Sequence, residues 1–142
     1  MRSKIIHWFL FVLSVFVFYA LSYWILFKIG VLTEIPNNKN LLTCDAAWYL
    51  SIVDNGYYLD LENQSNAGFF PGFPYFWKLL NANSLVISVI NGTLFLSGVY
   101  LLKSITNTTN LKTILILSLP SIFFFYLPYS ESLFYLFSVL FI

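Results

Sequence analysis

The chain has 142 residues, of which 59% are hydrophobic, 21% are aromatic and only 9% are charged. Soluble domains carry about 25% charged residues, so this composition excludes an ordinary soluble globular protein and predicts an integral membrane protein. The formal net charge of +1 provides no electrostatic basis for binding nucleic acid, and the single cysteine, Cys44, cannot form an intrachain disulfide.

The first long apolar run covers residues 5–27. It predicts a membrane-spanning helix, because about 20 helical residues cross the hydrocarbon core of a bilayer. Trp8 and Trp24 lie near its two ends, as aromatic residues do at membrane interfaces. A cleaved signal peptide is the competing interpretation, and the basic Arg2 and Lys4 fit it. The run is too long for a signal peptide and lacks the small-residue cleavage pattern, so a span is favoured.

Residues 28–83 are mostly polar or mixed and contain repeated glycines and prolines. This pattern predicts a long loop with short amphipathic helices inside it. One such helix is expected over residues 45–54, because Asp45 suits the N-cap or first turn and Gly56 lies where the helix would end. Three aromatic or apolar residues share one face of this helix, which we expect on the membrane surface: Trp48, Ile52 and, on the flank, Tyr49.

Two further spans are predicted, over residues 85–102 and 111–127, with a short polar link between them. Pro120 lies inside the second of these, where neighbouring helices can replace the hydrogen bond that proline cannot make. A last apolar stretch covers residues 132–142, which is too short to cross a bilayer. We therefore expect residues 1–142 to be one transmembrane domain, the N-terminal fragment of a longer all-α bundle, with three complete spans and the start of a fourth.

The placement of basic residues predicts the orientation of these spans. Lysine and arginine flank the N-terminus and the link near residues 103–112, whereas the long loop carries most of the acidic residues: Glu34, Asp45, Asp54, Asp60 and Glu62. The N-terminus and that link are therefore expected in the cytoplasm. The long loop and the turn at residues 128–131 are expected on the extracytoplasmic side of a bacterial inner membrane or of the endoplasmic reticulum.

Three segments on that outer side contain the residues suited to chemistry. They are Asp45 with its aromatic helix, the stiff apolar loop 68–74 (GFFPGFP), and residues 129–132 (YSES), where Glu131 precedes an apolar helix. Ionisable groups beside a membrane core are costly to keep and are candidates for function. Each segment also has a structural interpretation: Asp45 as a helix cap, the loop as packing, and Glu131 as a complement to a helix dipole.

Residues 45–53 (DAAWYLSIV), followed by Gly56-Tyr57, resemble the first luminal-loop signature of the PIG-V-type mannosyltransferases. The order of Phe69-Phe70-Pro71 and Phe73-Pro74 after it is similar to that family. Residues 120–124 (PSIFF) and 129–134 (YSESLF) resemble later elements of the same family. The family belongs to the GT-C class of polytopic glycosyltransferases, so the resemblance implies a GT-C type helical bundle.

Two positions depart from the family pattern. Cys44 stands where the family usually has tryptophan, which alters the aromatic packing behind the acid. Gly72 stands between the two Phe-Pro elements, where the family usually has a bulky residue. The family proteins are also much longer, so we expect the fragment alone to be inactive.

The resemblance implies that a sugar, usually mannose, is transferred from a polyprenyl- or dolichyl-phosphate donor on the extracytoplasmic side, with inversion. Asp45 aligns with the catalytic base, and a positioned carboxylate can take the proton of a sugar hydroxyl. Substrate contacts are expected from a group of nearby residues: Trp48, Tyr49, Phe69, Phe70, Tyr129 and Glu131. No cofactor is predicted, and the need for a metal stays open because one pair of acids is not a coordination shell.

The expected partners are therefore a lipid-linked sugar donor and membrane lipids, without nucleic acid. Two other functions compete with this one. A non-catalytic membrane subunit that packs against a partner chain is favoured by Cys44 and by the short chain. A transporter is the third alternative, but its acids would lie at mid-span and inverted repeats would be visible in the sequence.

Overall fold

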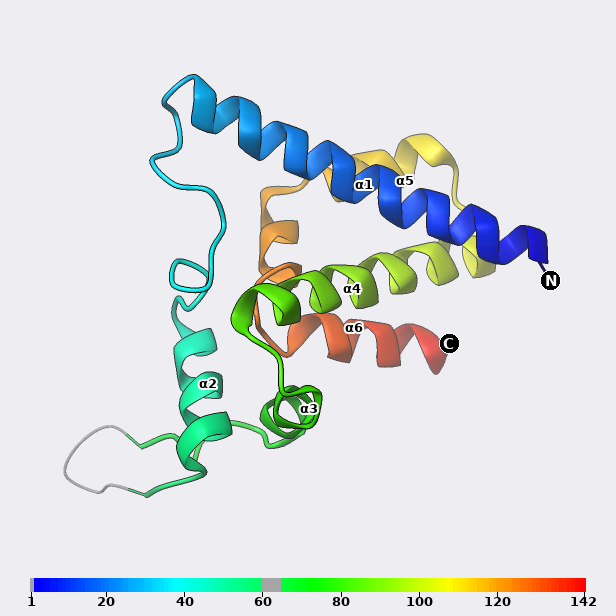
Figure 1. Ribbon diagram of the computed structural model, residues 1–142. Coiled ribbons are helices and arrows are strands. Elements are labelled where there is room, and N and C mark those ends of the chain that lie inside the picture. The colour runs from blue at the N-terminus through cyan, green and yellow to red at the C-terminus, as the bar shows by residue number, and fades with distance from the viewer. Residues whose placement is uncertain (1, 60–64) are drawn as a thin grey trace.

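The computed structural model describes residues 2–59 and 65–142, and these form helices without any strand (Figure 1). The all-α prediction is thereby confirmed. Asp60 and Glu62, two acids of the long loop, lie outside the described residues. In chain order the elements are α1 (Arg2–Lys28), α2 (Asp45–Asn55), α3 (Gly72–Leu80), α4 (Ser84–Thr106), α5 (Asn110–Leu117), the 3-10 helix η1 (Pro120–Phe125) and α6 (Glu131–Leu140).

Two helices, α1 and α4, are long and apolar enough to cross a membrane. They run antiparallel, because the indole N–H of Trp8 donates to the hydroxyl of Ser97 at 3.1 Å while Phe16 lies against Gly92. Few of the apolar side chains of α1 are buried within the protein, whereas α4 is much more enclosed. A core helix of a soluble protein would be covered on most sides, so the bare apolar surface of α1 favours a lipid environment.

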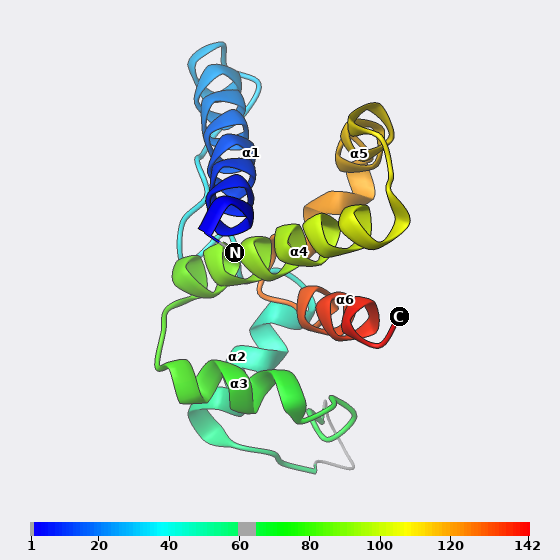
Figure 2. The ribbon, with the colours of Figure 1, turned by 90° about the vertical axis from the view of Figure 1, so that its right-hand side faces the viewer.

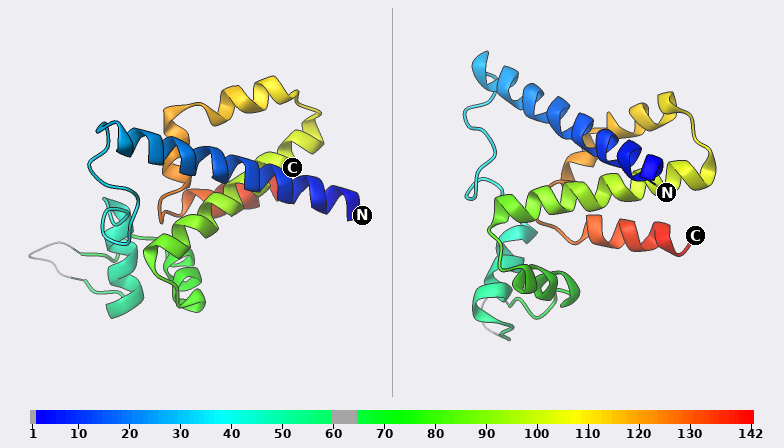
Figure 3. Two further views of the ribbon diagram at one scale, coloured as in Figure 1. Left: turned by 45° about the horizontal axis from the view of Figure 1, so that its top comes forward. Right: turned by 45° about the vertical axis from the view of Figure 1, so that its right-hand side comes forward.

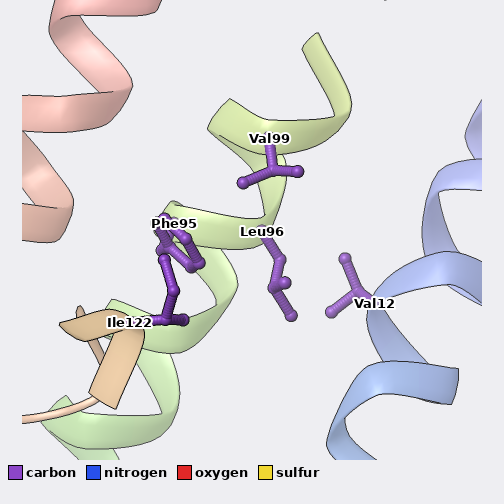
Figure 4. Close-up of a cluster of buried hydrophobic side chains, with 5 residues drawn as sticks. All are labelled: Val12, Phe95, Leu96, Val99 and Ile122. Atoms are coloured by element: carbon purple, nitrogen blue, oxygen red, sulfur yellow. The ribbon is translucent and has the colours of Figure 1, made fainter. Parts of the chain in front are cut away.

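Helix α4 is the centre of the bundle. Its buried side chains meet α1 on one side and η1 on the other, in a core cluster drawn in Figure 4: Val12, Phe95, Leu96, Val99 and Ile122. Helix α6 runs parallel to α4 and packs closely along it, as Figures 2 and 3 show. Gly98 permits this approach, since a Cβ atom there would lie 2.7 Å from the ring of Tyr135. Small residues allow such close helix packing in membranes.

A membrane span was expected over residues 111–127, but the backbone does not form one continuous helix there. Helix α5 ends at Leu117, and the chain resumes as η1 at Pro120. The cause is local: Leu119 is extended, with φ −68° and ψ 132°, because the residue before a proline is pushed out of the helical region. Neither piece is long enough to cross a bilayer alone. Within residues 2–59 and 65–142 two helices reach membrane length, so the expected three complete spans are not confirmed.

The long loop contains two short helices, α2 and α3, which pack against each other. They lie at the end of the bundle where α1 ends and where α4 and α6 begin, which we call the loop end (Figure 1). Residues 68–74 were expected to be irregular, yet residues 72–74 form the first turn of α3. Pro74 is accommodated there because the N–H groups of a first helical turn have no partner within the helix.

Candidate functional site

The site begins with Asp45, the first residue of α2. Cys44 precedes it with a φ of 45°, in the left-handed region that non-glycine residues rarely adopt. The carboxylate of Asp45 is exposed in the first turn of the helix, where free N–H groups favour negative charge. The helix ends at Asn55, where the N–H of Gly56 donates to the carbonyl of Ile52 at 2.9 Å. Both ends lie within one residue of the expected helix.

Two hydroxyl contacts join this segment to the turn before α6. The hydroxyl of Tyr129 donates to the carbonyl of Thr43 at 3.1 Å, two residues before Asp45. The hydroxyl of Tyr49 lies 3.1 Å from the hydroxyl of Ser130, four residues after Asp45. A small apolar cluster supports these contacts, formed by Leu41, Ala46, Leu127 and Tyr129. The first and third of the segments singled out in the sequence are therefore in contact.

The aromatic residues of the second segment complete the arrangement. The ring of Tyr49 lies edge-on to Phe69 at 5.3 Å and to Phe73 at 5.0 Å between centroids. Trp48 stacks on Phe69 at 6.0 Å. Offset and edge-to-face geometries such as these are the favourable ones for aromatic pairs. All three segments thus meet at the loop end, next to the first turn of α2.

Phe70 takes a different place from Phe69. Its side chain is 80% exposed, and its ring lies over Gly72, where a Cβ atom would be only 3.0 Å away. Gly72 therefore makes room for Phe70, which gives a local reason for glycine at a position that departs from the family pattern. Phe70 is turned to the outside and is free to contact lipid or another chain.

The six expected substrate contacts divide by exposure. Glu131 and Phe70 are exposed, and Trp48 and Phe69 are half-buried. Tyr49 and Tyr129 are only 7% and 5% exposed, and both hydroxyls are engaged by the protein itself. A side chain that is buried and internally hydrogen-bonded cannot also line an open substrate site in this conformation. The structure therefore gives these two tyrosines a role in holding α2.

Burial raises the pKa of Tyr49, and the negative charges of Glu131 and Asp45 raise it further, while the contact with Ser130 opposes them. Burial likewise raises the pKa of Tyr129, with the Thr43 contact opposing it and Asp45 adding a smaller rise. Both acids thus act electrostatically on Tyr49.

A hollow of about 480 Å³ at the loop end lies between the ends of α2 and α3 and the start of α4. Asp54 and Lys78 contribute opposite charges to its wall, but Asp45 does not line it. Metal binding has no obvious site either, since no group of three His, Cys, Asp or Glu side chains comes together among residues 2–59 and 65–142.

One residue of this region was not singled out from the sequence. Asn91 in α4 is fully buried, and its side-chain N–H groups donate to the carbonyls of Leu127 at 2.6 Å and of Tyr129 at 2.8 Å. It thereby fixes the turn that holds α2. The signal that could have revealed it is an amide in the middle of an apolar run, where a polar side chain must find partners inside the protein.

Comparisons with protein-family models, with curated proteins and with solved structures find no match to this chain. The fold and the site therefore define a broad class: an all-α protein with two membrane-length helices and an acidic, aromatic-rich cluster at one end of them. Any narrower assignment depends on the motifs and on the arrangement described above.

Proposed function

We propose that the protein is a membrane glycosyltransferase of the GT-C class, similar to the PIG-V-type mannosyltransferases. It would use a polyprenyl- or dolichyl-phosphate sugar, mannose above all, as donor. The observation that supports this most is the exposed carboxylate of Asp45 at the start of α2, with the other two family-like segments packed beside it. The resemblance places chemistry at this aspartate.

In the proposed reaction Asp45 accepts the proton of the acceptor hydroxyl while the oxygen of that hydroxyl attacks the anomeric carbon. The bond from that carbon to the lipid phosphate breaks at the same time, the phosphate leaves with the electron pair, and the configuration inverts. A carboxylate suits this role because it can take the proton of a hydroxyl in the transition state when it lies within hydrogen-bond reach. The stacked pair Trp48 and Phe69 would face the sugar or the lipid chain, and Glu131 would accept a hydrogen bond from the acceptor.

The proposal includes an orientation with the loop end outside the cytoplasm. It is supported by the antiparallel arrangement of α1 and α4. It is also supported by Lys103, at the end of α4 away from the loop end, and by Lys112 in α5. Single cysteines in a Cys44→Ser background test it, replacing the exposed Lys39 in the long loop or the exposed Lys112 in α5. An impermeant maleimide added to intact cells should label the first and not the second. The reverse pattern would overturn the orientation.

A transfer assay tests the catalytic base. The full-length protein is supplied with radiolabelled polyprenyl-phosphate mannose, and Asp45→Asn is compared with Asp54→Asn, which alters an exposed acid at the other end of the same helix. Loss of a general base typically lowers the rate by about 10²- to 10⁴-fold. We expect this loss for Asp45→Asn and near-normal transfer for Asp54→Asn. Undiminished transfer by Asp45→Asn would remove the assignment.

A second candidate is a non-catalytic membrane subunit that packs against a partner chain. The observation that favours it is the hollow at the loop end, which Asp45 does not line. Cys44, in place of the family's tryptophan, points the same way. Purification in mild detergent would separate the two: a stoichiometric second membrane protein, with no transfer by the wild type, supports the subunit and not the enzyme.

A further inference from the structure

The turn between η1 and α6 is held from one side by Asn91. The amide of this residue reaches two carbonyls of the turn, those of Leu127 and Tyr129, and is completely enclosed. Carbonyls in a turn have no helical partner, so a buried donor is needed to satisfy them. Asn91 thereby fixes the turn to the first half of α4, which is more enclosed than α1.

The same turn holds the start of α2 from the other side. Tyr129 contacts the backbone of Thr43, and Ser130 contacts Tyr49, at 3.1 Å in each case. These two contacts lie on either side of Asp45 in the sequence. They also flank Cys44, whose φ of 45° is a conformation that its neighbours must maintain.

We propose that Asn91, Tyr129 and Ser130 are positioning residues for Asp45. They connect α4 to the first turn of α2 through one turn of the chain, so that the carboxylate keeps a fixed place at the loop end. The catalytic part of this inference rests on the proposed function. The mechanical part, that the turn restrains the segment around Asp45, does not.

Burial distinguishes positioning from substrate contact here. Asn91 and Tyr129 are enclosed, whereas the carboxylate of Asp45 is exposed. The three residues therefore act on a substrate only through the placement of Asp45. A carboxylate displaced by as little as 1 Å loses much of its effect in proton transfer, because the reacting atoms must be aligned at hydrogen-bond distance.

Hydrogen exchange tests the mechanical part without any substrate. In the full-length protein in lipid nanodiscs, the amides of residues 43–49 are followed by mass spectrometry. Tyr129→Phe keeps the ring and removes the hydroxyl, and one lost hydrogen bond should speed local exchange about fivefold. Tyr100→Phe is the matched control, since its hydroxyl contacts Lys4 at the opposite end of the bundle. Exchange at the control rate in Tyr129→Phe would overturn the inference.

Kinetics test the catalytic part. Ser130→Ala should lower kcat severalfold with an unchanged KM for the donor, and Ser130→Thr, which keeps a hydroxyl, should restore it. Tyr129→Phe should lower kcat in the wild type but cause no further loss in the Asp45→Asn background, because its effect passes through that carboxylate. Faster exchange with undiminished turnover overturns the positioning role alone. Undiminished transfer by Asp45→Asn overturns the proposed function and leaves the exchange result to decide the mechanical part.

Discussion

Two successive segments of α4 hold their neighbours in different ways: residues 84–91, called here the polar half of residues 84–99, and residues 92–99, called the apolar half. In residues 84–91 the polar side chains all reach irregular backbone: Ser84 donates to the carbonyl of Asn38, Ser88 donates to that of Tyr126, and Asn91 donates to those of Leu127 and Tyr129. Ile87 adds apolar packing against Tyr49, Phe73 and Trp77. In residues 92–99 the buried contacts are mainly apolar, and they reach α1, η1 and α6.

This difference follows from what the neighbours need. A helix satisfies its own backbone groups, so it can be packed with apolar side chains and close approach alone. A turn or loop leaves carbonyls without partners, and those carbonyls require donors where water is excluded. Residues 84–91 donate hydrogen bonds to these carbonyls and thereby set where the long loop and the turn before α6 lie. The apolar half sets only how the helices pack.

The largest effect is expected in the apolar half. Phe95 is 2% exposed and stacks on Phe125 at 4.3 Å between centroids. Phe95→Ala should destabilise the protein by about 3 kcal/mol, because a cavity remains where the ring was. Thermal unfolding in a fixed detergent measures this. Phe134→Ala, at an exposed ring on α6, is the matched control and should be nearly neutral; equal losses would show that the cluster is not the core.

A smaller but more specific effect is expected in the polar half. Asn91→Leu keeps the branched shape and removes both donors, which leaves two turn carbonyls unpaired at a cost of about 2 kcal/mol. The loss should appear as faster amide exchange in the turn and around Asp45, with little change in residues 92–99. Thr93→Val in the same helix removes only a bond to its own backbone and should change little. Uniform loosening of the whole of α4 would contradict the division into halves.

The short helix α2 illustrates what the sequence specifies locally. An acid at its start, an amphipathic pattern and a glycine after its end were enough to place it within one residue at each boundary. Helix α3 could not be located in the same way, because glycine and proline, here Gly72 and Pro74, are typical of loops. Both residues fall in its first turn, where their usual disadvantage in a helix is small.

The candidate site was predictable in outline and not in its details. The distribution of basic residues predicted that the three segments lie on the same side of the membrane, and in the structure they meet around Tyr49. The sequence could not indicate that Tyr49 and Tyr129 are enclosed, because burial depends on how distant segments pack. Asn91 is a case of the same kind, since its partners lie 36 and 38 residues further along the chain. Pro120 was visible within an apolar run, where neighbouring helices were expected to replace its missing hydrogen bond. The backbone instead leaves the helix at Leu119.

Close approach offers a test within the apolar half. A Cβ atom at Gly98 would lie 2.7 Å from the ring of Tyr135, so Gly98→Ala forces α4 and α6 apart. Overpacking costs about 1–3 kcal/mol, and the better helix propensity of alanine offsets up to about 1 kcal/mol of that. We expect a net loss of about 1 kcal/mol in thermal unfolding. Gly68→Ala, where a Cβ atom meets nothing within 4 Å, is the control, and an equal loss there would exclude a packing cause.

The smallest expected effect concerns pH at Tyr49 in α2, whose hydroxyl contacts the turn that the polar half of α4 holds. Burial, with Glu131 and Asp45 adding, raises the pKa of Tyr49 above the ordinary value of 10.0. A raised pKa means that the folded state favours the neutral phenol, so this stabilisation is complete below pH 10 and is lost as the pH rises through the folded pKa. Protection of residues 43–49 from exchange should therefore fall at alkaline pH, and tyrosinate absorbance should reveal a late-titrating group.

Two variants sharpen this test. Tyr49→Phe cannot ionise, so part of the alkaline loss of protection should disappear, although the Ser130 contact is lost at every pH. Asp45→Asn removes one of the two negative charges and should lower the pKa of Tyr49 only slightly, because burial is the larger cause. A large shift in Asp45→Asn would instead show that charge, and not enclosure by Phe69 and Phe73, governs this tyrosine. The place of α2 would then depend on charge near Tyr49 more than on the packing of its ring.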